Sequence, residues 1–282
     1  MDTIFRTPIL MGLTVALATS MSIAQSKQEK RFNSGSKPTV SVLNDYGPVS
    51  VRPGTSNQVI VIYTLASKAV EVDSNQSGDR ITIQTHVLQA GTPQASRVDY
   101  ELIVPPDASV TISSADGPIV IEKLRGDVSV EGATAPVDIR EISEAHVHVK
   151  TLSGPVHLAN VRQGHVEITS VSGSITLDGV SGPIVSANSA SGKISYDGDF
   201  GDGGSYKLTS HTGDIEASLP ADASVDLTAH TAKGTVDSQY PLQPKSHSMF
   251  PTGAGRLVGT TGRAASSVLL NSISGKIHLK KH

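Results

Sequence analysis

The chain has 282 residues, enough for one large all-β domain or two smaller ones, and a formal net charge of −3 at pH 7. This near-neutral charge argues against a nucleic-acid-binding surface, and four Phe, six Tyr and no Trp leave few platforms for stacking sugars or bases. Because cysteine is absent, the sequence excludes disulfides, thiol nucleophiles and lipid-modified cysteines.

Residues 1–24 have the features of a signal peptide. Arg6 precedes an apolar run over residues 9–18, and Ser22-Ile23-Ala24 forms a small-x-small cleavage motif. The run is shorter than the roughly 20 apolar residues that a spanning helix needs. We therefore expect export to the periplasm, the cell surface or the medium, with a mature chain that starts at Gln25 and has no transmembrane span. Residues 25–38 are polar, and we expect a disordered lead there.

Residues 39–106 contain several short stretches in which apolar and polar residues alternate, which indicates strands. Their spacing is irregular, although Gly47-Pro48-Val49-Ser50-Val51 matches the repeat found further along the chain. The sequence predicts an N-terminal β region that caps the open edge of the first regular coil, either as irregular coils or as a separate small sandwich.

A repeat occupies the segment from Gly117 to Tyr196 and dominates residues 107–282. Its unit is Gly-x-Φ-x-Φ-x-x-Φ, where Φ is apolar, and successive units start nine or ten residues apart. A fixed short period with alternating Val and Ile predicts stacked β-strands. An antiparallel meander is the alternative, but the corners are Ser-Gly pairs and not the Asn-Gly or Asp-Gly of tight hairpins.

We therefore predict an all-β fold, a right-handed parallel β-solenoid with an irregular N-terminal β cap and no significant helix after the signal peptide. Two units form one coil of 18 to 19 residues, and each coil adds about 4.8 Å along the axis. Units starting at 117, 135, 154, 173 and 192 should stack on one sheet, and those starting at 126, 145, 164 and 182 on the other. A long loop is expected near 241–263, before a last clean unit at 274–279.

This stacking brings together one group of potential metal ligands. His146 and His148 point outward from one unit, and His165 and Glu167 occupy the same positions one coil later. Imidazole and carboxylate suit zinc, although the spacing is not that of a closed site. The alternative is a solvated outer face with a His–Glu cross-strand pair.

A second group lies in the glycine-rich stretch after Tyr196. Asp197, Asp199 and Asp202 offer carboxylates for Ca²⁺, but their spacing departs from the EF-hand pattern and Leu208 stands where its bidentate Glu belongs. The alternative is a flexible polar excursion between coils.

Catalytic motifs are absent from the sequence: it has no Gly-x-Ser-x-Gly elbow, Walker loop or His-Glu-x-x-His. Stacking of the coils offers candidates for the carboxylate pair that glycoside hydrolysis requires. These candidates are Asp138, Glu141, Glu144, Glu167 and Glu216. No aromatic residues cluster around them, so solvated outer positions are the favoured interpretation.

Three longer stretches resemble the bacterial putative-adhesin family of exported β-strand-repeat proteins. They are "ELIVPPDASVTIS", "SHTGDIEASLPADASVDLTAHTAKGTV" and the closing "NSISGKIHL". The resemblance covers about residues 39–280. It implies a solenoid-like fold and an envelope or surface location, and it transfers no catalytic residues.

Together these observations predict an exported, non-enzymatic, adhesin-like β-repeat protein that acts as a binding or scaffolding module at the cell envelope. Its expected partner is an envelope polymer, a surface glycan or an envelope protein, and no cofactor is expected beyond zinc or calcium at the two groups above. The alternatives are a polysaccharide-active β-helix enzyme and a self-assembling structural solenoid.

Overall fold

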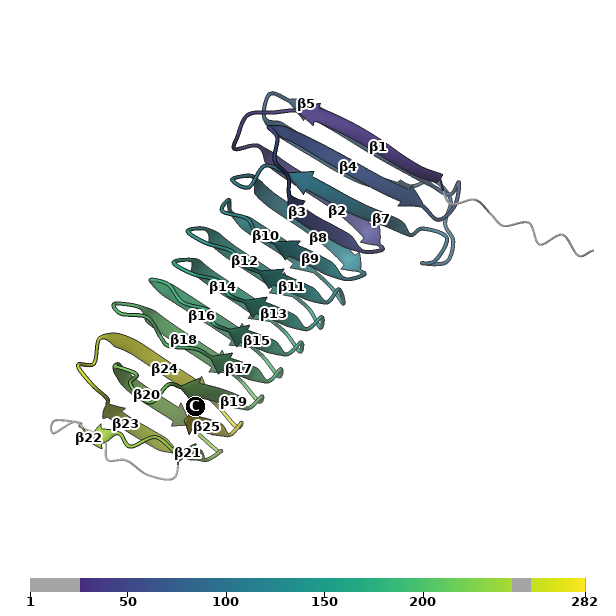
Figure 1. The fold of residues 1–282 in the computed structure, drawn as a ribbon. Coiled ribbons are helices and arrows are strands. Elements are labelled where there is room, and N and C mark those ends of the chain that lie inside the picture. The colour runs from purple at the N-terminus through teal and green to yellow at the C-terminus, as the bar shows by residue number, and fades with distance from the viewer. Residues whose placement is uncertain (1–25, 245–254, 282) are drawn as a thin grey trace, which may run out of the picture.

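The computed structural model describes residues 26–244 and 255–281, so the predicted signal peptide lies outside the described residues. The described residues form 25 strands and no helix, arranged in a 12-stranded and a 13-stranded sheet. The two sheets face each other along an elongated, open-ended rod (Figure 1). The predicted all-β solenoid is confirmed, and its hand stays a prediction. Within these ranges no helix could cross a membrane.

The central coils follow the predicted stacking. Strands of the 12-stranded sheet run parallel and in register, so that Val137 lies beside Val156 and Val156 beside Ile175. These strands are β9 (Ile119–Glu122), β11 (Val137–Arg140), β13 (Val156–Ala159), β15 (Ile175–Asp178), β17 (Ile194–Asp197) and β19 (Ile215–Leu219). Their partners in the 13-stranded sheet are β8 (Ser109–Asp116), β10 (Val128–Gly132), β12 (His146–Thr151), β14 (His165–Ser170), β16 (Ile184–Ser189) and β18 (Ser205–Ser210).

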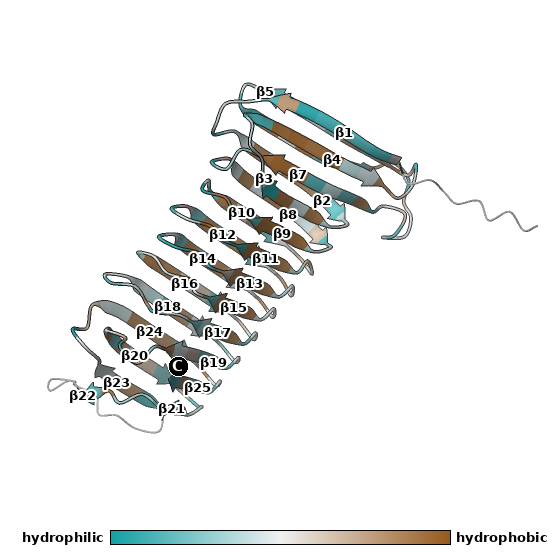
Figure 2. Cartoon of the chain, viewed as in Figure 1, coloured by the Kyte–Doolittle hydropathy of each residue, from teal (hydrophilic) through white to brown (hydrophobic). Residues whose placement is uncertain are grey.

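Alternation along each strand builds one continuous apolar interior. Inward Val, Ile and Leu side chains are buried along the whole rod, and the brown bands of Figure 2 follow them. Each fully buried side chain of this size contributes about 1.5–3 kcal/mol relative to an exposed one. Because the interior is filled, the outward positions are the ones that can meet a ligand.

Glycine and a hydroxyl residue together form the corner between the sheets. The Ser189 hydroxyl accepts a hydrogen bond from the Gly192 amide at 2.8 Å, and the same bond recurs between Ser210 and Gly213 at 2.9 Å. A Cβ at Gly192 would lie 2.0 Å from the carbonyl oxygen of Gly173, one coil below. The Ser-Gly corners are therefore a packing requirement.

The N-terminal region is continuous with the rod. Strands β2 (Thr39–Tyr46) and β3 (Val49–Pro53) form a coil that pairs in parallel with β8 and β9 on one side. On the other side they pair with β6 (Arg80–Val87) and β7 (Val98–Val104). The antiparallel strands β4 (Gln58–Leu65) and β5 (Val70–Ser77) extend the sheets beyond this coil. Residues 39–106 are thus irregular coils with an antiparallel end.

The expected disordered lead is wrong for most of its length. Residues Ser26–Asn33 form strand β1, which pairs antiparallel with β4 along all eight residues. Phe32 packs against the core. The edge of β4 supplies unpaired backbone groups, and pairing with β1 satisfies them even though the strand's own side chains are mostly polar.

The C-terminal end has the same kind of arrangement. Strands β24 (Ser266–Ser272) and β25 (Ile277–Lys281) are inserted between the β18–β19 coil and a coil made of β20 (Val225–Thr231) and β21 (Val236–Ser238). The expected loop near 241–263 is wrong in part, because β22 (Gln243–Pro244) and β23 (Arg256–Thr260) pair antiparallel at this end. As at the N-terminal end, added strands satisfy a sheet edge.

Candidate functional site

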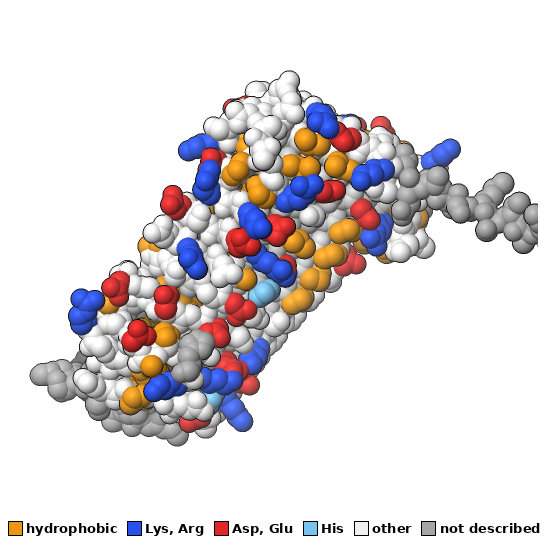
Figure 3. Space-filling view, in the orientation of Figure 1, with side chains coloured by type: hydrophobic (Ala, Val, Ile, Leu, Met, Phe, Trp, Pro, Cys, Tyr) orange, Lys and Arg blue, Asp and Glu red, His pale blue; other side chains and the backbone are white. Residues whose placement is uncertain are grey.

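The outer faces of the rod carry rows of side chains, one per coil. Parallel in-register pairing places equivalent outward residues of successive coils side by side. Figure 3 shows cationic and anionic side chains interspersed over the face in view. Candidate sites are therefore groups that stacking brings together.

The histidine patch consists of His146, His148, His165 and Glu167 on β12 and β14, and stacking brings these residues together as predicted. His146 lies beside His165, with ring centroids 5.1 Å apart, and His148 lies beside Glu167. The Glu167 carboxylate lies 3.5 Å from the His148 Nδ1 atom and 3.5 Å from the His165 Nε2 atom. Glu167 thus contacts one histidine of its own strand and one of the neighbouring strand.

Metal binding at this patch stays a prediction. In the described ranges, no group of three or more His, Cys, Asp or Glu residues is arranged to hold a metal ion. Asp127, which extends the row, uses its carboxylate to accept a hydrogen bond from the His146 amide at 3.0 Å. A zinc ion would therefore require side-chain rearrangement.

The acidic loop, with Asp197, Asp199 and Asp202, is anchored to the core. Phe200 lies in the middle of the loop and is buried, and its ring stacks on Tyr196 at 4.2 Å. The three carboxylates are exposed, and Asp202 lies 3.6 Å from the guanidinium of Arg263. Calcium at this loop also stays a prediction.

The carboxylates considered for glycoside hydrolysis have cationic neighbours. Asp138 binds Arg140 and lies 3.5 Å from His157, Glu216 binds Lys193 at 2.6 Å and also contacts Lys280, and Glu141 lies 3.9 Å from Lys123. Glu144 acts electrostatically on Arg125, whose pKa is raised mainly by its hydrogen bond to Asp107.

Sequence reasoning missed the role of His157. Its ring lies between two carboxylates, with Nδ1 3.5 Å from Asp138 and Nε2 2.8 Å from Asp178. These residues belong to three successive coils, β11, β13 and β15. The signal was present in the sequence. His157 follows Asp138 by 19 residues, the same offset that aligns His146 with His165 in the histidine patch.

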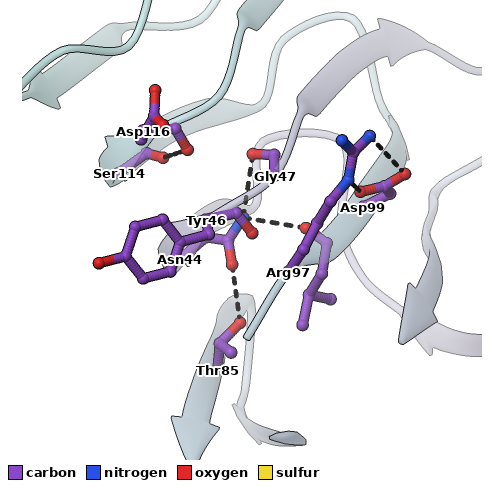
Figure 4. Close-up of polar contacts among 9 residues, drawn as sticks. Asn44, Tyr46, Gly47, Thr85, Arg97, Asp99, Ser114 and Asp116 are labelled. Atoms are coloured by element: carbon purple, nitrogen blue, oxygen red, sulfur yellow. Dashed lines mark hydrogen bonds and ion pairs between the residues drawn. The ribbon is translucent and has the colours of Figure 1, made fainter. Parts of the chain in front are cut away.

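A polar cluster buried at the N-terminal end has a structural role (Figure 4). The Asn44 amide donates hydrogen bonds to the carbonyl oxygens of Tyr46, Gly47 and Val98 at 3.1–3.2 Å, and its own oxygen accepts one from Thr85. Thr85 also bonds the hydroxyl of Tyr100, and burial raises the pKa of that tyrosine to about 12. These bonds join the coil of β2 and β3 to the neighbouring strands β6 and β7.

A ridge of apolar and small side chains follows the corner where the 13-stranded sheet turns into the 12-stranded sheet. Leu152, Val171 and Ile273 are 55 %, 49 % and 42 % exposed. In spatial order the corner ridge consists of Ala115, Ala133, Leu152, Val171, Ala190, His211, Ile273 and Ala232. Grooves of about 460 and 340 Å³ lie beside the ridge where alanines replace larger residues, at Ala190 and at Ala115 and Ala133.

Comparisons with known proteins give one family model and remote matches among solved structures. The family model described as Toastrack DUF4097 matches residues 40–280. A "putative adhesin" from Bacteroides fragilis is 11 % identical, with 90 % of this chain and 97 % of that chain covered and a TM-score of 0.47. A "putative cell adhesion protein" from Clostridium sporogenes is 12 % identical, with 92 % and 100 % covered and a TM-score of 0.30. No curated protein matches.

Proposed function

This chain belongs to the Toastrack DUF4097 family, and from that premise we propose that it is an exported, non-enzymatic module that binds or scaffolds an envelope component. The partner would be an envelope polymer, a surface glycan or an envelope protein. The mode of binding would be many weak contacts along an outer face of the rod, as solenoid proteins commonly use.

One observation carries this proposal: the polar and ionisable side chains lie in rows on the outer faces, whereas apolar side chains fill the interior. Inward side chains are buried from coil to coil, and the grooves near the corner ridge are shallow surface features next to Ser, Thr and Asn side chains. An enzyme acting on a polysaccharide would need a pair of carboxylates that can reach the substrate, whereas Asp138 and Glu216 are engaged with Arg140 and Lys193.

Binding is tested with the purified mature chain, starting at Gln25, on whole cells, isolated envelope polymers and a glycan array. Each binding measurement is made in calcium and again in chelator. Saturable binding without any change in the ligand supports the proposal. Turnover of the ligand would contradict it and would direct attention to the carboxylates of the 12-stranded sheet.

Export is tested separately, by cell fractionation and by sequencing the N-terminus of the protein outside the cytoplasm. We expect a chain that begins at Gln25. A matched variant, Ala24→Arg, should block processing because a large charged residue does not fit the small-x-small cleavage motif. Full-length protein that stays in the cytoplasm in both cases would refute export.

A further inference from the structure

Two of the three exposed apolar side chains of the corner ridge meet alanines when the ridge is reversed. The ridge residues from Ala115 to Ala232 have their midpoint between Val171 and Ala190, and beyond Ala115 the same row continues with the exposed Asp45 of β2. An antiparallel copy centred there would place Val171 against Ala190 and Ile273 against Ala133. Val171 and Ile273 would then each meet an alanine, with room in the grooves beside those alanines, whereas Leu152 would meet the larger His211.

The charges of the neighbouring row complement one another in the same way. This row follows the ridge one residue later in every coil, and it has Asp116 near one end and Lys233 at the other, with only Ser and Thr between them. Both charged residues are exposed. An antiparallel copy on the same midpoint brings Asp116 of each copy against Lys233 of the other, so two ion pairs form per dimer.

We propose that the corner ridge is a homodimer interface, in which two copies pack antiparallel about a twofold axis that crosses the ridge between Val171 and Ala190. A second copy is the occupant because it has the same spacing of about 4.8 Å per coil, so every ridge residue meets a counterpart. The dimer goes beyond the proposed binding function, and it leaves the outer faces of both sheets open.

The size of the ridge makes the dimer a weak one. Eight coils at about 4.8 Å each, and a width of three residues, cover roughly 400 Å² per copy. A stable complex usually buries about 800 Å² per partner, so this interface belongs with transient associations. We expect a dimer whose population rises with chain concentration and falls as salt screens the two exposed ion pairs.

Sedimentation of the mature chain over a concentration series provides the first test. We expect a monomer–dimer equilibrium that Val171→Asp weakens more than tenfold, because it places a charge in the apolar centre of the contact. The matched control is Leu88→Asp, at an equally exposed leucine outside the ridge, which should leave the equilibrium unchanged. A monomer at all concentrations up to the millimolar range, or equal effects of both variants, would refute the interface.

A charge exchange tests the antiparallel arrangement. Lys233→Asp places a carboxylate against Asp116 of the other copy at each end of the contact, and it should weaken the dimer about tenfold. Adding Asp116→Lys to the same chain exchanges both charges and should restore the original affinity. Loss without restoration would contradict the pairing of these two residues. Circular dichroism of each variant separates a lost dimer from a lost fold.

Cross-linking tests the axis directly, because the natural chain has no cysteine. Ser153 and Thr212 lie three coils apart in one copy but face each other across the proposed axis. The double variant Ser153→Cys/Thr212→Cys should be joined into dimers by a short bis-maleimide, whereas Ser153→Cys alone should not. Efficient cross-linking of the single variant would indicate a parallel dimer.

A monomeric chain whose binding to envelope polymers is abolished by Val171→Asp would assign the ridge to another partner. Either result would refute the proposal.

Discussion

Replacing one corner glycine in the middle of the rod tests the packing on which every coil depends. Gly192 links β16 to β17, and its amide donates a hydrogen bond to the Ser189 hydroxyl. A Cβ added there would lie 2.0 Å from the carbonyl oxygen and 2.7 Å from the carbonyl carbon of Gly173, and 2.9 Å from the Ser189 hydroxyl oxygen. Two of these three atoms belong to the backbone of the coil below, so no rotamer change relieves the contact.

The expected cost of Gly192→Ala follows from these distances. Ordinary contact requires a separation beyond 3.4 Å, so the corner must move by more than 1 Å. Overpacking of this kind costs about 1–3 kcal/mol, and the displaced corner loses a buried hydrogen bond worth about 1 kcal/mol. We therefore expect a loss of roughly 3 kcal/mol in the free energy of unfolding, a large share of the total stability of a domain.

Gly132→Ala is the control, because Gly132 lies in an equivalent corner at the position that Ser189 occupies in the Gly192 corner. Its nearest neighbours, Ala135 and Ser114, would be 3.6–3.8 Å from the new Cβ, which is ordinary contact. We expect it to be neutral or to stabilise by about 0.5 kcal/mol through the unfolded chain. Urea unfolding measures both changes, and hydrogen exchange locates any local opening. Equal stabilities of the two variants would show that the corners yield freely and would refute the packing argument.

Four further predictions test other features. Thr209→Val should stabilise the protein by about 1 kcal/mol in urea unfolding, because the buried Thr209 hydroxyl has no hydrogen-bond partner among the described residues. The control Thr231→Val removes a hydroxyl that is hydrogen-bonded to Gly275, so it should destabilise the protein. Asn44→Leu should cost about 3 kcal/mol, since three carbonyl groups lose their donor, and a cost below 1 kcal/mol would contradict that role. Burial raises the pKa of Tyr196, so the folded protein keeps a proton that the unfolded chain loses above about pH 10. The free energy of unfolding should therefore fall as the pH rises above this value. In Tyr196→Phe, which has no such proton, the fall should be less steep. Calorimetry should detect weak zinc binding to the histidine patch, and His165→Ala should abolish it. The melting temperature in calcium and in chelator tests calcium binding at the acidic loop. An absence of zinc heat ends the zinc hypothesis, and equal melting temperatures end the calcium hypothesis.

The repeat let the sequence predict the register of the central coils. A coil of 19 residues places His146 beside His165 and His148 beside Glu167, as the structure confirms. This succeeded because apolar alternation and the Ser-Gly corner act on every coil in the same way, so local rules determine neighbours far apart in sequence. The ion pairs around Glu167 then follow from the stacking.

The ends of the rod could not be predicted in this way, because their pairing depends on edges and not on periodicity. Strand β1 has a mostly polar sequence, and only the open edge of β4 explains why it is ordered. The same holds for β23, which lies in a stretch rich in Pro, Gly and Ser and pairs with β20. Propensity is a weak guide wherever an unpaired edge determines the outcome.

The last repeat unit of the sequence is regular although an irregular stretch precedes it, and its position in the rod explains this. Residues 274–279 form the cleanest unit after the break at 197–204, although they lie near the C-terminus. Their strand, β25, is not at the end of the rod but between β19 and β21, and β24 likewise lies between β18 and β20. An inner strand must pair on both edges, which requires the strict pattern. Among the segments that pass around it, β21 and β22 pair on one edge only, and they are short strands of three and two residues. At the other end β2 and β3 are enclosed in the same way by coils that come later in the sequence. Regular strands in this protein are therefore those enclosed within the rod, and, apart from β1, the strands that cover the first and last coils come from internal segments of the sequence.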